Sequence, residues 1–287
     1  MNPPATTQRV LYDVARRAGY IPKGDDVNLD PEKSQEILGY MDDRLQEAWE
    51  MYDFVETTML EQRAFRPDWD QSVCYPAGAI VWDPCSQQYY QALAQTVGGP
   101  LQNTLVWQAN PSSVTPRYIP WWTPGKNPIG TAFGAWNKNP YEDPNRIRIQ
   151  YFVSMRGLEF TATSNVAFVW LLYRIPYPGI GRDEWSATTT YNKGDAVVDG
   201  EDTYICSVDN TVALEPSSTP TNWTVFRIPW PMKRYVIQAA FSDTLVTDGQ
   251  NEKAPGELQK AFSYLQEAFD QQMLQQGQRE NWQGYAR

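Results

Sequence analysis

The hydrophobic positions at the two ends of the chain repeat with the period of an α-helix. Residues 6–20 place apolar side chains on one face, with a threonine before them and Gly19 after them. A threonine cap and a closing glycine are usual helix boundaries. Residues 254–278 repeat apolar side chains at steps of three and four residues, namely Leu258, Phe262, Leu265, Phe269 and Met273. Both ends are therefore predicted to be helical.

The longest apolar stripe lies in residues 30–65. Asp30 is predicted to be the N-cap, Pro31 the first helical residue, and Glu32 a favourable charge in the first turn. Apolar side chains then recur along one face: Ile37, Met41, Leu45, Ala48, Tyr52 and Val55. The pattern predicts one helix of roughly thirty residues. Such a narrow stripe needs partner helices, either from the same chain or from neighbouring subunits.

The middle of the chain changes to a β pattern. Segments rich in Val, Ile, Phe and Tyr with partial alternation are predicted to be strands: 146–155, 157–164, 166–173 and 233–241. We therefore predict an α+β fold, in which helices from both termini pack together beside a β core. Two small inserted all-β modules complete the predicted fold.

The two modules are predicted from an internal repeat. Residues 69–107 and 185–226 share Trp-x5-Tyr-x2-Gly-x2-Val, a second Tyr, a Pro 25 residues after the first Tyr, and a closing Trp seven residues later. So many matched spacings indicate a duplication, and each copy would be a small sheet around its tryptophans. The pattern residues are interpreted as mainly structural: Trp69, Tyr75, Gly78, Tyr90, Trp107, Trp185, Tyr191, Gly194, Tyr204 and Trp223.

Two proline motifs flank the second copy, "YRIPYP" at 173–178 and "FRIPWP" at 226–231. Each proline favours extended backbone in the residue before it, so we expect the two motifs to pair and to bring the ends of the module together. The chain then divides into six segments: an N-terminal helical region spanning residues 1–65, the first module 66–110, the β core 111–183, the second module 184–226, a return strand of the core 227–250, and a C-terminal helix and tail 251–287.

The composition excludes several function classes. The 287 residues carry a net charge of −10, and an acidic chain is a poor candidate for tight nucleic-acid binding. There is no histidine, the commonest general base and metal ligand. The three cysteines are too few and too scattered for a disulfide framework or a zinc site, which fits a reducing compartment. We expect neither a signal peptide nor a membrane-spanning segment.

The acidic clusters do not point to catalysis. Asp42 and Asp43 lie on the predicted long helix among opposite charges, and we interpret both as solvated. Asp25 and Asp26 lie in a glycine-containing turn, which makes them weak candidates for holding a cation. Motifs of known hydrolases, nucleotide-binding enzymes and deaminases do not occur. We therefore expect no enzyme, no cofactor and no metal site.

The repeated pattern resembles the small chitin-binding module of carbohydrate-binding families 5 and 12. The second copy, "YNKGDAVVDGEDTY", is the better match. In that family an aromatic pair soon after the second Tyr stacks on sugar rings, but the matching residues here are "ALAQT" (92–96) and "CSVDN" (206–210). The resemblance therefore implies the module fold more than sugar binding. Trp121 and Trp122 lie outside the repeat and are the candidates for glycan stacking.

The two ends of the chain resemble head-to-tail adaptor proteins of tailed bacteriophages. The likeness rests on "QRVLYDVARRAGYIP", "DPEKSQEILGYMDDRLQEAWE" and the closing segment 236–269. It implies a virion protein that forms a ring, usually of twelve copies, between a portal protein and a tail or nozzle protein. We expect residues 270–287 to be extended or disordered in the free monomer and to order when they dock in the portal. The docking candidates are Trp282, Tyr285 and Arg287.

The same resemblance implies that duplex DNA passes through the ring. The acidic composition predicts passage without tight binding, because carboxylates repel phosphate. Arg146, Arg148 and Arg156 lie on or beside predicted strands, where they would form ordinary ion pairs or a local phosphate contact. The alternative function is a host-glycan-binding tail or surface protein that uses the two modules.

Overall fold

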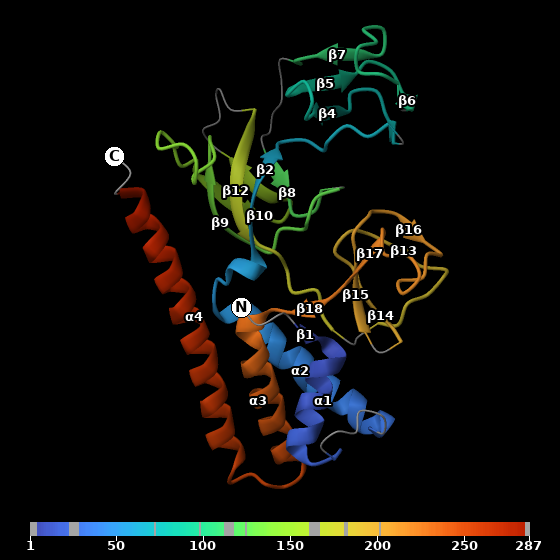
Figure 1. Ribbon diagram of the computed structural model, residues 1–287. Helices are drawn as coiled ribbons and strands as arrows, with labels where there is room; N and C mark the ends of the chain where they lie inside the picture. The colour runs from blue at the N-terminus through green and yellow to red at the C-terminus, as the bar shows by residue number, and fades with distance from the viewer. Residues whose placement is uncertain are drawn as a thin grey trace. The chain divides into compact units, whose positions relative to one another are not determined.

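The structure is a computed structural model that describes residues 5–22, 29–71, 73–97, 99–111, 118–123, 125–160, 167–180, 183–200 and 202–284, with side chains as far as residue 275. Helices near the two ends of the chain flank a middle region of small antiparallel sheets in the sequence (Figure 1), which confirms the predicted α+β class. The chain divides into two compact units. The helical unit contains Met1–Thr57 and Tyr177–Arg287, and the β unit contains Thr58–Pro176.

The helical unit is built around α3. Its helices are α1 (Thr7–Ala18), α2 (Pro31–Met51), α3 (Trp230–Thr247) and α4 (Ala254–Gly284), and α3 packs against each of the others. The predicted caps are confirmed. Thr6 caps α1, and Gly19 closes it with a φ of 81°, a left-handed conformation that glycine adopts without strain. Asp30 caps α2 through the Glu32 N–H at 3.0 Å.

The predicted strand 233–241 is wrong, because these residues belong to α3. The predicted return strand 227–250 is therefore mostly helix. Three helices surround α3, so its buried side chains point in nearly every direction. A helix with buried side chains in nearly every direction loses the 3.6-residue period, and a short continuous apolar run is then indistinguishable from a buried strand.

The long helix predicted for residues 30–65 is also too long. α2 ends at Met51, Tyr52 is extended, and residues Thr58–Ala64 form strand β2. The apolar period continues past the helix end because Tyr52 stacks on Phe269 of α4, with ring centroids 4.6 Å apart. β-branched residues cluster just after the helix end, and they favour extended backbone.

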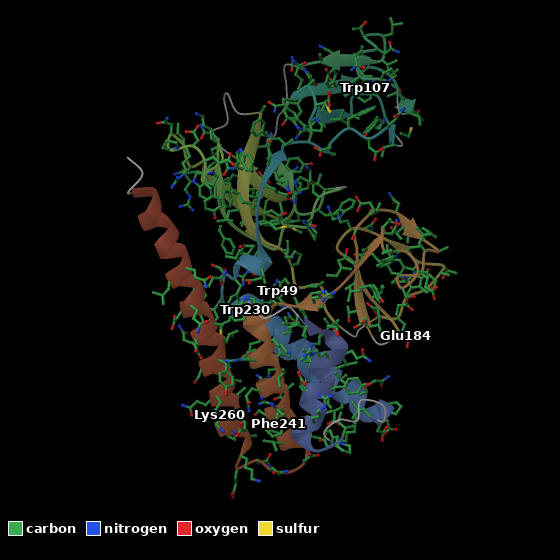
Figure 2. All side chains as sticks on the ribbon, in the orientation of Figure 1. Trp49, Trp107, Glu184, Trp230, Phe241 and Lys260 are labelled. Carbon is green, nitrogen blue, oxygen red and sulfur yellow. The ribbon has the colours of Figure 1, made fainter. Side chains whose placement is uncertain are left out.

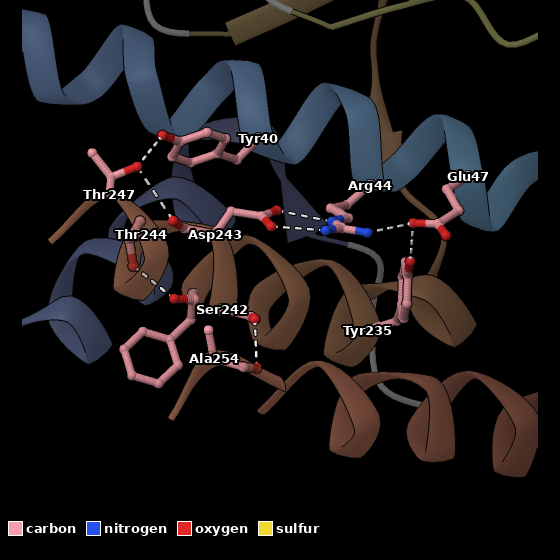
Figure 3. Close-up of polar contacts among 10 residues, drawn as sticks. Tyr40, Arg44, Glu47, Tyr235, Ser242, Asp243, Thr244, Thr247 and Ala254 are labelled. Carbon is pink, nitrogen blue, oxygen red and sulfur yellow. Dashed lines mark hydrogen bonds and ion pairs between the residues drawn. The ribbon is translucent and has the colours of Figure 1, made fainter. Parts of the chain in front are cut away.

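A polar seam joins α2 to α3 (Figure 3). Arg44 donates to both carboxylate oxygens of Asp243, at 2.8 and 2.7 Å, in a bidentate pair. The Tyr235 hydroxyl donates to Glu47 at 2.6 Å, and Tyr40 bonds the Thr247 hydroxyl at 2.5 Å. Burial, followed by the bond to Glu47, raises the pKa of Tyr235 above its usual value. The seam fixes which side of α3 faces α2.

α4 continues as a helix to Gly284. The expectation that residues 270–284 are extended or disordered is therefore wrong for their backbone. The early turns of α4 bury Ala261 and Leu265, whereas Met273 and Leu274 are 51% and 69% exposed. α4 thus runs on from its packed turns and presents apolar side chains to solvent.

The β unit combines two three-stranded antiparallel sheets with the first module. One sheet has the order β2-β12-β9 and the other β10-β11-β8. Their shared core is rich in aromatic and aliphatic side chains, including Phe65, Leu158 and Leu171. Gly157 has a φ of 146°, and a Cβ there would lie 2.0 Å from a backbone oxygen, so only glycine fits. The strands are β8 (Tyr118–Pro120), β9 (Thr131–Trp136), β10 (Tyr151–Ser154), β11 (Gly157–Phe160) and β12 (Phe168–Arg174).

The two modules have the same fold. Each contains a two-stranded sheet and a three-stranded antiparallel sheet in the same order, β3-β6 with β4-β5-β7 and β13-β16 with β14-β15-β17. The first module has β3 (Cys74–Tyr75), β4 (Ile80–Asp83), β5 (Gln88–Ala92), β6 (Thr96–Val97) and β7 (Trp107–Ala109). The second has β13 (Thr190–Tyr191), β14 (Ala196–Asp199), β15 (Asp202–Cys206), β16 (Thr211–Val212) and β17 (Trp223–Val225).

The ends of the second module meet differently from the prediction. Residues Arg227–Ile228 of "FRIPWP" form β18, whose sheet partner is β1 (Ala5–Thr6), so the predicted pairing with "YRIPYP" is wrong. Trp49 of α2, labelled in Figure 2, joins the two motifs instead, with its ring 5.6 Å from Tyr177 and 6.5 Å from Phe226. A buried tryptophan and an N-terminal strand therefore close the base of the module.

Candidate functional site

The repeated sequence pattern builds the same core twice. The Tyr75 ring meets the Trp107 ring at 5.6 Å and 70°, and the Tyr191 ring meets the Trp223 ring at 5.3 Å and 69°. Each phenol oxygen accepts a backbone N–H near the start of its module, at 2.7 and 2.8 Å. Each closing tryptophan donates its indole N–H to a loop carbonyl, at 3.2 and 2.9 Å. These side chains form the module interiors.

The remaining pattern residues complete these interiors. Gly78 and Gly194 have φ values of 86° and 98°, which glycine adopts without strain. Their N–H groups bond the last residue of β5 and of β15, at 2.7 and 2.9 Å. The other four are half-buried against the two module cores: Trp69, Tyr90, Trp185 and Tyr204.

The residues proposed for glycan stacking do not form one aromatic platform. Trp121 is half-buried, packs on the β-unit core and donates its indole N–H to the Ser154 carbonyl at 3.1 Å. Trp122 is 43% exposed. Within the modules, Ala92 and Cys206, which begin the stretches that match the family's stacking residues, are both 1% exposed. The sugar-stacking arrangement of the resembling family is not reproduced by these side chains.

The outward face of each module has a different environment, which the sequence analysis missed. Trp82 and Tyr89 of the first module are 3% and 7% exposed and belong to the β-unit core, where Trp82 lies 6.0 Å from Phe168. The equivalent positions in the second module are Val198, which is half-buried, and Thr203, a smaller polar side chain that is 2% exposed. In the sequence, Trp82 follows the pattern residue Val81 and Tyr89 precedes the pattern residue Tyr90. These large aromatic side chains on the opposite face of the strands could have indicated a second buried surface on the first module.

A buried arginine supports the loop that carries the two tryptophans. Arg63 of β2 is 2% exposed and pairs with Glu61. Its guanidinium donates to the Tyr173 hydroxyl at 2.8 Å and to the Asn127 carbonyl, which follows Trp122 in the same loop. Burial is the main cause that raises the pKa of Tyr173 above its usual value. This cluster links β2 and β12 to the loop that carries Trp121 and Trp122.

Asp42 is buried, so the interpretation of it as a solvated residue is wrong. Its side chain is on α2, and the residue is 5% exposed. One carboxylate oxygen accepts the Tyr177 hydroxyl at 2.7 Å and the Ile180 N–H at 2.8 Å. Asp42 therefore fixes the segment that leads into the second module. Asp43 is exposed, as predicted.

A groove of about 580 Å³ crosses the helical unit between α1 and α4, over the first turns of α3. Trp230, Ile237 and Ala268 contribute apolar surface, and its basic side chains are Arg9, Lys233 and Arg234. Of its two carboxylates, Asp13 is already paired with Arg16 at 3.1 Å and lies 3.7 Å from Lys233, and Glu267 is exposed. Arg9 and Arg234 are both exposed. The groove thus combines an apolar floor with a rim on which cations outnumber carboxylates by three to two.

None of the remaining predicted site residues that the structure describes lines this groove. Arg156 is 3.5 Å from Glu159, and Arg146 and Arg148 donate to backbone carbonyls at 2.6 and 3.0 Å. For Trp282 only the helical backbone is described, and Tyr285, Arg287, Asp25 and Asp26 lie outside the described residues. Among the residues that the structure describes, there is no cluster of His, Cys, Asp and Glu that could hold a metal ion. No described helix is long and apolar enough to cross a membrane.

Tyr20 makes the helical unit sensitive to alkaline pH. Its hydroxyl donates to Asp248 at 2.8 Å, and burial together with this bond raises its pKa to about 12. A raised pKa stabilises the fold while the phenol is protonated, so this contribution is lost as the pH rises from about 10 through about 12. We expect phenolate absorbance and circular dichroism to show late tyrosine ionisation with loss of helix. Tyr20→Phe should lose this component of the transition, and unchanged titration curves in that variant would contradict the assignment.

The chain matches no protein-family model and no curated protein in sequence comparisons.

Proposed function

We propose that this protein is a structural virion protein, a head-to-tail adaptor that forms a ring between portal and tail in a tailed bacteriophage. The observation that carries the proposal is the single helical unit formed by both ends of the chain, from which α4 continues with exposed Met273 and Leu274. A projecting helix with an exposed apolar end suits insertion into a partner protein. The resemblance of the chain ends to adaptor proteins gives that partner as the portal.

The charge distribution supports a passage for DNA more than a binding site. The β unit contains nine Lys and Arg residues and seven Asp and Glu residues, a net charge of +2, so the helical unit carries −12 and accounts for the acidity of the whole chain. In the β unit, Arg146, Arg148 and Arg156 already contact carbonyls or a carboxylate. Weak, salt-sensitive contact with phosphate is what such a distribution supports.

Removal of residues 274–287 tests the proposal. The truncated protein should keep its helical circular dichroism, since α4 packs on α3 through earlier residues such as Leu265, and should lose binding to purified portal. Val246→Ser, which changes another exposed apolar side chain (52% exposed) elsewhere in the helical unit, is the matched control and should bind normally. Portal binding that survives the truncation would contradict the proposed role of α4.

Glycan binding is the second candidate function, supported by a shallow cleft in the β unit. The cleft holds about 520 Å³ and places Phe168 and Trp170 beside the polar side chains of residues 137–143. Aromatic rings beside amide and carboxylate groups suit the apolar faces and hydroxyls of a sugar. Retention of the protein on chitin or cell-wall beads, with no binding to portal, would favour this function over the adaptor role.

A further inference from the structure

The groove of the helical unit and α2 lie on opposite sides of α3. On α3, the groove is lined by Trp230, Lys233, Arg234 and Ile237, whereas Tyr235 and Asp243 bond α2. At 3.6 residues per turn these two sets point to opposite sides of the helix. The groove is therefore the side of α3 that α2 of the same chain does not cover.

The outer face of α2 complements the groove in charge. α2 contains six carboxylates and two cations, whereas α1 contains three arginines and one carboxylate. The side chains of α2 turned away from the core form a stripe that includes the exposed residues Glu32, Asp43 and Glu50. Beyond Glu50, Met51 is 41% exposed and Val55 is 53% exposed. An acidic stripe with an apolar end thus matches a rim with an excess of cations around an apolar floor.

We propose that the groove binds the outer stripe of α2 from a second copy of this chain. Arg9 and Arg234 would meet Asp43 and Glu50 of the neighbour, and its Met51 would approach Trp230. This inference rests on the proposed function, because it supplies the contact between neighbouring copies in the ring. The proposed interface is head-to-tail, because the groove and the stripe are different surfaces of each copy.

The head-to-tail arrangement follows from the positions of the two surfaces. Each copy offers a groove on one side of α3 and α2 on the other, so a bound copy still has its own groove free. Repetition of such a heterologous contact gives a closed ring when the rotation closes and a filament when it does not. Each α3 would then lie between its own α2 and that of its neighbour.

Charge reversal tests this interface without the portal. The groove variant is Arg9→Glu with Arg234→Glu, and the stripe variant is Asp43→Lys with Glu50→Lys. Each places like charges together, and we expect at least about tenfold weaker self-association by mass photometry or sedimentation velocity. The control is Lys260→Glu with Glu252→Lys, which reverses charges at exposed positions outside both surfaces; Figure 2 labels Lys260 on α4.

Mixing the two variants gives the decisive result. An intact stripe then meets an intact groove, and a basic stripe meets an acidic groove, so assembly should recover in an equimolar mixture. Failure to recover, while circular dichroism shows both variants folded, would overturn the inference, as would normal assembly of either variant alone.

Different experimental results would contradict the proposed function and the proposed interface. A wild-type protein that assembles but never binds portal would contradict the adaptor role and leave the interface standing. Portal binding by a protein that is indifferent to both charge reversals would overturn the interface alone. A wild-type protein that stays monomeric both with and without portal would overturn both.

Discussion

Replacement of Asp42 with Ala is expected to lower the free energy of unfolding of the helical unit by about 3 kcal/mol, because it removes a buried charged acceptor that serves two donors. The Tyr177 hydroxyl and the Ile180 N–H bond the same carboxylate oxygen, and residue 42 is only 5% exposed. Without the carboxylate, both donors lose this acceptor, and burial limits access to water. Urea unfolding followed by circular dichroism measures the difference.

Asp43→Ala is the matched control for this prediction. The residue has the same side chain on the same helix, but it is exposed, so its replacement should change stability by less than about 0.5 kcal/mol. Tyr177→Phe removes the hydroxyl bond to Asp42 but keeps the bond from the Ile180 N–H, so it should give an intermediate loss. Equal stability of the Asp42 and Asp43 variants would show that the buried carboxylate contributes nothing to the fold.

Asp42 also shows where sequence reasoning about local structure stops. The caps Thr6 and Asp30 were predictable because a cap bonds the backbone within a few residues. The partners of Asp42 are more than a hundred residues away, at Tyr177 and Ile180. A carboxylate on a helix between charged neighbours gives no local sign of such partners, so exposure was the natural but incorrect expectation.

The difference between local and long-range contacts also explains why residues 233–241 of α3 were wrongly predicted to be a strand. The apolar period predicts a helix when one face is buried and the other solvated, as in α1. α3 buries Tyr235, Val236 and Ile237 in succession because other helices surround it. Tertiary packing had removed the period on which the prediction depended. The groove beside α3 was equally hidden, since its lining combines α1 with α3 and α4 from the opposite end of the chain.

The repeat was the most informative feature of the candidate site. Constant spacing from Trp69 to Trp107 and from Trp185 to Trp223 predicted two copies of one fold, because each spacing fixes a contact inside the module. The spacing does not predict which residues contact the outer face of a module, the face that carries Trp82 in the first module and Val198 in the second. The structure shows that difference at Trp82 and Val198, which occupy equivalent positions.

The two modules are therefore expected to respond oppositely to removal. Replacement of residues 185–225 by a short Gly/Ser linker should leave the helical unit cooperatively folded, because Trp49, β1 and β18 still close the base. The same replacement of residues 69–107 should abolish the cooperative transition of the β unit. It removes Trp82 and Tyr89 from the core of that unit, and loss of such large buried side chains costs about 3–5 kcal/mol each against a typical domain stability of about 5–15 kcal/mol.

Point variants at equivalent positions separate the outer face from the module itself. Trp82→Ala should destabilise the β unit by about 3–5 kcal/mol, whereas Val198→Ala removes a smaller, half-buried side chain and should cost about 1 kcal/mol. Differential scanning calorimetry of both point variants and both linker variants measures these effects. Similar losses from the two point variants would contradict the difference between the modules. Loss of all cooperative melting in the 185–225 linker variant would instead make the second module integral to the helical core, because the closure at Trp49 would then be insufficient without it.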